Sequence, residues 1–246
     1  MKPLQHARIT AHRYGGKWQD WIVVHNWIDH SKLIFPSMQH RIFLHSDFGE
    51  WLIVRIFGER IKAEDGTTVS TLDLFRDHQL EDLGRAVTLS EWLREVQADY
   101  WKRRLRTPRH LERIREEPAA GLAGRWGGAP DDYLALIDFF DQPSKLAPDL
   151  SEAAELITHN SFGIFLAEEL LGTTINLTDR GASQLSNQTI STRSAAEDLV
   201  WARIGSIPPA GNLASRIRLR LWMRGTEVRA ALKVRRENER LAAGRV

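Results

Sequence analysis

The sequence predicts a mostly α-helical (α+β) protein made of two homologous helical units, each with a small β-hairpin, packed with pseudo-twofold symmetry. Three observations predict this fold: a repeat that spans most of the chain, apolar residues at helical spacing, and alternating residues around one turn per copy. With 246 residues and 42% hydrophobic content, the chain is long enough to bury a core. We expect a first unit at 1–105, a second at 106–225 and a basic helix at 226–246.

The repeat consists of short matching segments that occur in the same order. The segments that begin at Arg13 and Arg125 both read Arg-aromatic-Gly-Gly. The triplet Glu-Asp-Leu at 81–83 recurs at 197–199. Because the order is kept while the spacing slips only slightly, we interpret the chain as a tandem, diverged duplication.

Each unit begins with helices. A glycine pair ends the first helix of each copy, because glycine readily adopts the left-handed backbone found after helices. Further helices are expected around residues 18–34 and 131–142, and another over 159–172, where apolar residues recur at helical spacing. Gly163 lies inside the last of these and costs about 1 kcal/mol relative to alanine, which predicts a close helix crossing.

After these helices the period of the pattern changes. Residues 59–70 alternate around Asp65-Gly66, which is a strong hairpin signal, and residues 173–186 repeat the pattern in a longer and weaker form. Two helices complete the first unit, at 70–84 and 88–96, and the second of them begins with a capping box.

Composition and missing motifs exclude several kinds of protein. The chain has no cysteine, which excludes disulfides, thiolate nucleophiles and cysteine-ligated zinc. It has neither an apolar signal core nor about 18 consecutive apolar residues, so we expect a cytoplasmic protein without membrane contact. We expect this protein to be a monomer with internal pseudo-symmetry or a small homo-oligomer. A Walker A lysine and a Gly-x-Ser-x-Gly motif are also absent, which favours a non-enzymatic protein.

Positive charge is concentrated in two segments of a chain whose formal net charge is only +2. Residues 101–115 carry seven Lys/Arg and one acid, and residues 216–246 carry ten Lys/Arg and three acids. Clustered cations suit a protein or nucleic-acid partner with an acidic surface, or else the acidic remainder of the chain itself. The residues predicted to contact such a partner are Arg103, Arg104, Arg106, Arg229, Lys233, Arg235 and Arg236.

Histidine and aspartate residues of the first unit form the best chemical lead. Two His–Asp pairs are spaced four residues apart on predicted helices, so each pair shares one helix face. Imidazole and carboxylate groups together suit a divalent metal such as zinc, manganese or iron. The predicted ligands are His25, Asp29, His45, His78 and Asp82.

The second copy keeps only part of this set. Under the alignment above, Asp141, His159 and Asp198 are retained, while Ile137 and Ser194 replace two histidines. A metal site is therefore expected in the first unit alone. A structural network of His–Asp hydrogen bonds explains the same pattern and stays open as the alternative.

The motif of the first unit resembles a family of uncharacterised bacterial and phage proteins, a domain of unknown function. The resemblance rests on Gly15-Gly16, Asp20, His25, Trp27-x-Asp29, Lys32, His40-Arg41, His45, Gly49, Gly58, His78 and Glu81-Asp82-Leu83-Gly84. It covers nearly all of the first unit and, more loosely, the second. It implies a shared fold unit and no particular reaction.

Three functions follow from these patterns. We expect a non-enzymatic binding or interaction protein in which the basic segments contact an acidic partner. One alternative is a metal-dependent hydrolase centred on the first unit. The other is a nucleic-acid-binding protein that uses residues 101–115 and 216–246.

Overall fold

The computed structural model describes residues 1–96, 107–178 and 188–223. Within these ranges the chain is mostly helical and forms two separate antiparallel hairpins, which confirms the predicted fold class. The described chain divides into two compact units, Met1–Thr88 with 218–223 and Leu89–Ile217. Both predicted unit boundaries fall outside the described residues, so they stay predictions, as does the pseudo-twofold packing.

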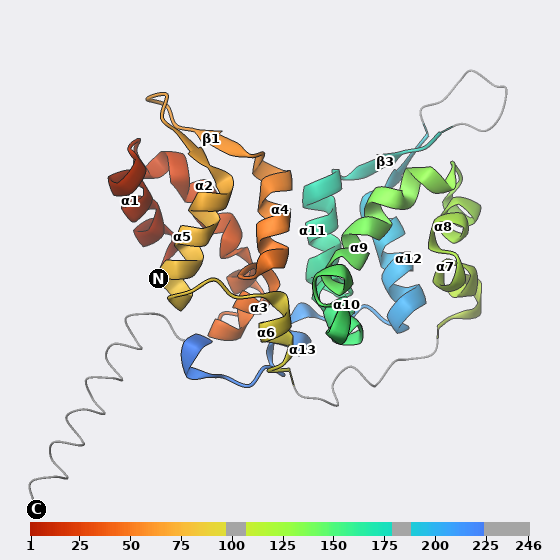
Figure 1. Cartoon of the computed structure of the whole chain (residues 1–246). Coiled ribbons are helices and arrows are strands. Elements are labelled where there is room, and N and C mark those ends of the chain that lie inside the picture. Colours follow the sequence, from red (N-terminus) through yellow and green to blue (C-terminus); the bar gives the residue numbers. More distant parts are fainter. Residues whose placement is uncertain (97–106, 179–187, 224–246) are drawn as a thin grey trace, which may run out of the picture. The chain divides into compact units, whose positions relative to one another are not determined.

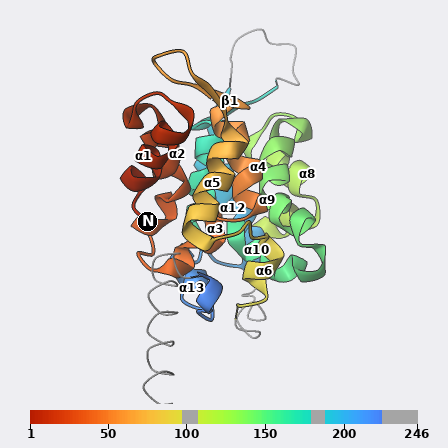
Figure 2. The same ribbon diagram turned by 60° about the vertical axis from the view of Figure 1, so that its left-hand side comes forward.

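The first unit is a set of helices with one hairpin. Figures 1 and 2 show α1 beside α2. The hairpin leaves the end of α4 and leads directly into α5, which packs on α4 (Figure 1). The elements are α1 (Pro3–Tyr14), α2 (Trp18–Ile28), η1 (His30–Leu33), η2 (Met38–His40), α3 (Arg41–Leu44), α4 (Asp47–Phe57), β1 (Arg60–Lys62), β2 (Thr68–Ser70), α5 (Thr71–Leu83) and η6 (Leu221–Met223).

The second unit repeats this order with additions. It also includes α6, a helix from the end of the first sequence repeat, which packs against α9 and α10. Its elements are α6 (Leu89–Leu93), η3 (Arg109–Leu111), α7 (Glu112–Glu116), α8 (Pro118–Trp126), η4 (Pro130–Tyr133), α9 (Leu134–Leu146), η5 (Pro148–Leu150), α10 (Ser151–Thr158), α11 (Ser161–Leu171), β3 (Thr174–Asn176), β4 (Thr189–Ser191), α12 (Thr192–Ile204) and α13 (Ala210–Ala214).

Aromatic side chains fill the core of each unit, where their large apolar area stabilises the packing. Trp21, Phe43, Phe48 and Phe75 are fully buried in the first unit. The corresponding set in the second unit is Trp92, Tyr133, Phe139, Phe140 and Phe162. No described helix is both long enough and apolar enough to cross a membrane.

The hairpins correct one expectation. In the first, Ile61 pairs with Val69 and Gly66 takes a left-handed backbone at the turn, as predicted. In the second, Ile175 pairs with Ile190, so the second strand lies beyond the range 173–186 that the sequence pattern suggested. The longer loop pushes every later element of the second unit further along the chain.

This shift changes which residues of the two copies correspond. Helices α5 and α12 each have 13 residues, are capped by Ser70 and Ser191, and are followed by Gly84 and Gly205. Asp198 is therefore the equivalent of Asp77 and not of Asp82. The alignment of the Glu-Asp-Leu triplets is wrong.

Hydrogen bonds confirm the corrected register. Asp77 forms an ion pair with Arg13 and accepts a hydrogen bond from the Tyr14 hydroxyl at 2.8 Å. In the second unit, Asp198 forms an ion pair with Arg125 and accepts one from the Trp126 indole at 2.8 Å. Two copies that keep the same three-residue contact share the same fold at this point.

Candidate metal centre

Four side chains from three places in the first unit meet in its interior. Asp29 follows the last residue of α2, His45 follows α3, and His78 and Asp82 lie one turn apart on α5. All four are buried, with exposures of 3% or less. One ligand atom from each lies within 4.8 Å of the other three. This arrangement brings together four of the five predicted ligands.

The separations within the cluster match a metal polyhedron better than hydrogen bonds. His45 Nε2 lies 3.5 Å from Asp29 Oδ1 and 3.4 Å from Asp82 Oδ2. His78 Nε2 lies 3.7 Å and 3.6 Å from the same two oxygens. These distances exceed an ordinary N–H···O hydrogen bond of about 2.9–3.0 Å. These four N–O separations are close to the roughly 3.3–3.4 Å edge of a tetrahedron whose metal–ligand bonds are about 2.0–2.1 Å, while the four ligand atoms as a set lie within 4.8 Å of one another.

Two atoms that face the centre of the cluster have no hydrogen-bond partner among the described residues. They are Asp29 Oδ1 and His78 Nε2, and both are inaccessible to solvent. A buried polar atom left unsatisfied costs about 1–3 kcal/mol, so proteins nearly always pair such groups. A cation bound between the four side chains would satisfy both atoms.

A glycine makes the corner that points His45 inward. Helix α3 ends at Leu44 and α4 begins at Asp47, so the chain turns within two residues. A Cβ atom at Gly49 would lie 2.0 Å from the carbonyl oxygen of Leu44. Only glycine permits this approach. The same geometry at Gly163, whose Cβ would lie 1.7 Å from Thr158 O, shows that the predicted close crossing is a tight corner between successive helices.

His25, the fifth predicted ligand, lies behind the cluster and not in it. Its Nδ1 is 2.9 Å from Nδ1 of His78, and its Nε2 is 2.9 Å from the Thr10 hydroxyl. If His78 Nδ1–H donates to His25, then His25 Nε2–H donates to Thr10, and His78 Nε2 keeps a lone pair toward the centre. Hydrogen bonds of this kind orient metal-binding histidines in proteins. We therefore assign His25 to a supporting role.

Cations contact both carboxylates, Lys32 on the outer oxygen of Asp29 and Arg41 on the oxygen of Asp82 that also faces the imidazoles. Lys32 Nζ lies 2.5 Å from Asp29 Oδ2, and Arg41 Nη2 lies 2.7 Å from Asp82 Oδ2. Burial opposes ionisation of both aspartates, yet the facing imidazoles outweigh it and lower the pKa of each carboxyl well below its usual value. The aspartates are therefore ionised and available as ligands.

The histidines of the cluster differ in their protonation. Burial lowers the pKa of His45 to about 4, so its imidazole is neutral at pH 7. Burial also opposes the charged form of His78, but its two aspartate neighbours raise its pKa above the usual value. Without a metal, a protonated His78 would supply positive charge between the carboxylates. A metal would displace that proton, since only the neutral imidazole is a ligand.

Acid should destabilise the first unit before its carboxylates titrate. Burial lowers the pKa of His25 to about 2, whereas an unfolded histidine titrates near 6.5. Between these values the unfolded chain binds more protons, so stability is complete above about pH 6.5 and falls as pH decreases. We expect the free energy of unfolding in urea, measured with chelator, to fall between pH 7 and pH 5 by about 2 kcal/mol less in His25→Ile than in the wild type. Equal pH slopes would contradict the assignment.

Several residues of the cluster are absent from the sequence prediction. His40 Nε2 lies 4.0 Å from Asp29 Oδ1, and His6 Nε2 lies 3.4 Å from Asp82 Oδ1. One signal was available for the N-terminal helix, because His6 and Thr10 are four residues apart and share a face.

The residues predicted to contact an acidic partner lie outside the described residues, as does the predicted helix at 226–246. These partner contacts are Arg103, Arg104, Arg106, Arg229, Lys233, Arg235 and Arg236.

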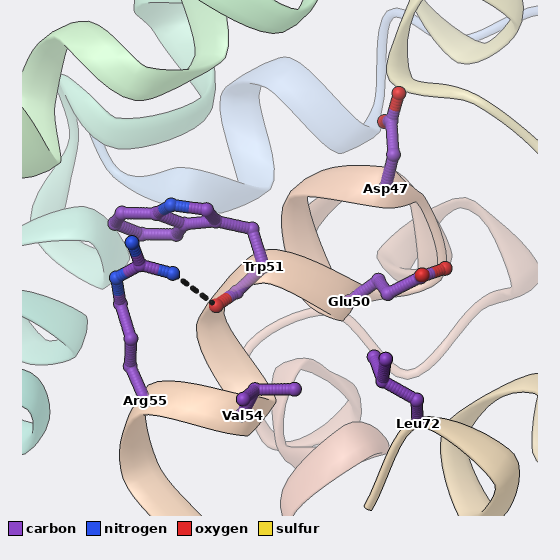
Figure 3. Close-up of a pocket in the computed structure, with 6 residues that line it drawn as sticks. All are labelled: Asp47, Glu50, Trp51, Val54, Arg55 and Leu72. Atoms are coloured by element: carbon purple, nitrogen blue, oxygen red, sulfur yellow. Dashed lines mark hydrogen bonds between the residues drawn. The ribbon is translucent and has the colours of Figure 1, made fainter. Parts of the chain in front are cut away.

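A surface cleft of about 320 Å³ lies elsewhere in the first unit. Figure 3 shows its lining from α4 and α5, where the Arg55 guanidinium covers the Trp51 ring at 4.1 Å and donates to the Trp51 carbonyl oxygen at 3.2 Å. None of the four cluster residues lines this cleft. It gives no access to the metal centre.

Comparison with known proteins supports the duplication. The model of a family described as a domain of unknown function (DUF6915) matches residues 1–102 and 117–223. The first matched segment contains α1 to α6 and the second contains α8 to α13, which are the two runs of equivalent elements. No curated protein and no solved structure matches the chain.

Proposed function

Because the family to which the chain belongs is described only as a domain of unknown function (DUF6915) and so indicates no activity, we propose the function of the protein from the cluster itself. The protein is a non-enzymatic binding protein whose first unit holds one divalent transition metal. The observation that supports this proposal is the convergence of Asp29, His45, His78 and Asp82, all buried, on one point.

The donor set favours zinc among the common metals. Two imidazole nitrogens and two carboxylate oxygens suit zinc, manganese or iron, whereas magnesium and calcium prefer six or more oxygen ligands. Four protein ligands, with nitrogen and oxygen donors, are typical of zinc. When bound, the metal would supply a positive charge that joins the end of α2, the corner after α3, and α5.

Burial of all four ligands favours a structural metal over a catalytic one. A catalytic zinc keeps one position open for water or substrate, while a structural zinc is closed by four protein ligands. His45, His78 and Asp82 have no exposed surface, and Asp29 has 3%. The hydrolase alternative would need an open position, so we do not favour it.

An acidic partner completes the proposal. Within the described part of 101–115, Arg109, Arg113 and Arg115 are exposed on the second unit. Exposed arginines suit carboxylate or phosphate groups of a protein or nucleic acid. The structural metal would then stabilise one domain of a protein whose binding residues lie elsewhere.

Metal uptake by the full-length protein tests the proposed function. After dialysis against Zn²⁺, we expect elemental analysis to find about one zinc per chain in the wild type and in His12→Ala, an exposed control, and none in His45→Ala. At a free concentration of about 100 Kd, the metal should stabilise the fold by about 2.7 kcal/mol, or roughly 5–10 °C in Tm. A wild-type protein that takes up no zinc and whose Tm does not respond to chelator would overturn the proposal.

A further inference from the structure

In the second unit, a different set of side chains occupies the place of the metal cluster. The corrected register pairs the four ligands with Asp141, His159, Leu199 and Arg203, in the order Asp29, His45, His78 and Asp82. The copy therefore keeps one carboxylate and one imidazole. It replaces the second imidazole by an apolar side chain and the second carboxylate by a guanidinium.

The Arg203 guanidinium lies between the two retained ligand types. Its Nη1 is 2.5 Å from Asp141 Oδ1 and 3.2 Å from His159 Nε2. His159 Nδ1–H donates to the carbonyl oxygen of Glu155 at 2.7 Å, which leaves Nε2 as the acceptor toward Arg203. In the first unit, the equivalent atoms Asp29 Oδ1 and His45 Nε2 face the centre of the cluster, 3.5 Å apart.

We propose that Arg203 is a covalently attached substitute for the metal cation, so that metal dependence is confined to the first unit. This inference rests on the proposed function. In both units a positive group would join a carboxylate oxygen and an imidazole Nε2 from the same two places in the fold. The first unit would take this group from solution, and the second carries it on α12.

The supporting residues of the second copy changed together with the ligands. Thr10, His25 and His78 form a chain of hydrogen bonds that ends at the cluster. Their equivalents Leu122, Ile137 and Leu199 are all apolar. A chain that orients a metal-binding imidazole has no use once that imidazole is gone, so its loss as a whole fits the replacement of the metal.

Two substitutions should turn the second unit into a metal site. In the full-length protein, Leu199→His with Arg203→Asp restores the ligand types of the first unit. After dialysis against Zn²⁺, we expect elemental analysis to give about two zinc per chain, against one in the wild type. We also expect this variant to have a lower Tm than the wild type in chelator and to regain most of the difference with Zn²⁺. A folded variant that still takes up one zinc overturns the inference.

A second measurement tests the inference if the double variant Leu199→His with Arg203→Asp fails to fold. Arg203→Ala should lower the Tm in chelator clearly more than Arg193→Ala, because Arg193 lies on the same helix in a surface ion pair with Glu168. Equal losses would overturn the inference. Failure of the proposed function has a different signature: the wild type would take up no zinc, whatever the two arginine variants do.

Discussion

Asp82→Ala is expected to lower the free energy of unfolding of the metal-free protein by about 3–5 kcal/mol, because it leaves buried charges without their partner. Asp82 lies 2.7 Å from Arg41 and faces His45 and His78, and none of its own surface is exposed. Removing it leaves the Arg41 guanidinium, which is only 5% exposed, without a carboxylate. Urea unfolding in the presence of chelator measures the loss.

A control on the same helix separates burial from charge. Asp77 forms its ion pair with Arg13, a side chain that is 43% exposed. Exposed pairs contribute about 0–1 kcal/mol, so Asp77→Ala should cost far less than Asp82→Ala. Similar losses for the two variants would show that the cluster is not the buried electrostatic centre of the first unit.

Gly163→Ala is expected to destabilise the second unit by about 3 kcal/mol. A Cβ at this position would lie 1.7 Å from the backbone carbonyl oxygen of Thr158, so one of the two helices at the corner must move. Backbone atoms cannot rotate away as the end of a side chain can. The midpoint of urea unfolding measures the effect.

Gly124→Ala is the matched control in the same unit. Gly124 lies within α8, and a Cβ there would meet only the end of the Arg113 side chain, at 3.2 Å. That flexible group can move at little cost, and alanine is favoured over glycine in a helix by about 1 kcal/mol. The two substitutions should therefore have opposite signs. A loss of stability in Gly124→Ala equal to that in Gly163→Ala would contradict this account of the corner.

Local signals predicted most of the fold correctly. The glycine pairs and the turn at Gly66 each act within a few residues, so their meaning does not depend on the rest of the chain. The equivalence of Asp82 and Asp198 failed because a recurring triplet gives no information on loop length. The longer loop before β4 displaced the whole of α12.

The candidate site was predictable in part for a similar reason. Spacing shows that two side chains share a helix face, so the pairs His25–Asp29 and His78–Asp82 could be selected from the sequence. His45 was added as a further histidine of the first unit. Spacing does not show which of two histidines points to a common centre, and His25 in fact contacts His78. The contribution of the N-terminal helix required the packing of α1 on α2 and α5, which brings Thr10 to His25.

An anomalous difference map from crystals of the full-length protein grown with Zn²⁺ tests the central claim most directly. We expect one strong peak at the zinc absorption edge, about 2.0–2.2 Å from His45 Nε2, His78 Nε2 and one oxygen each of Asp29 and Asp82, with no peak beside Arg203. A map with no peak among these four residues, in crystals where His78 donates a hydrogen bond to an aspartate, would show that the cluster holds a proton and not a metal.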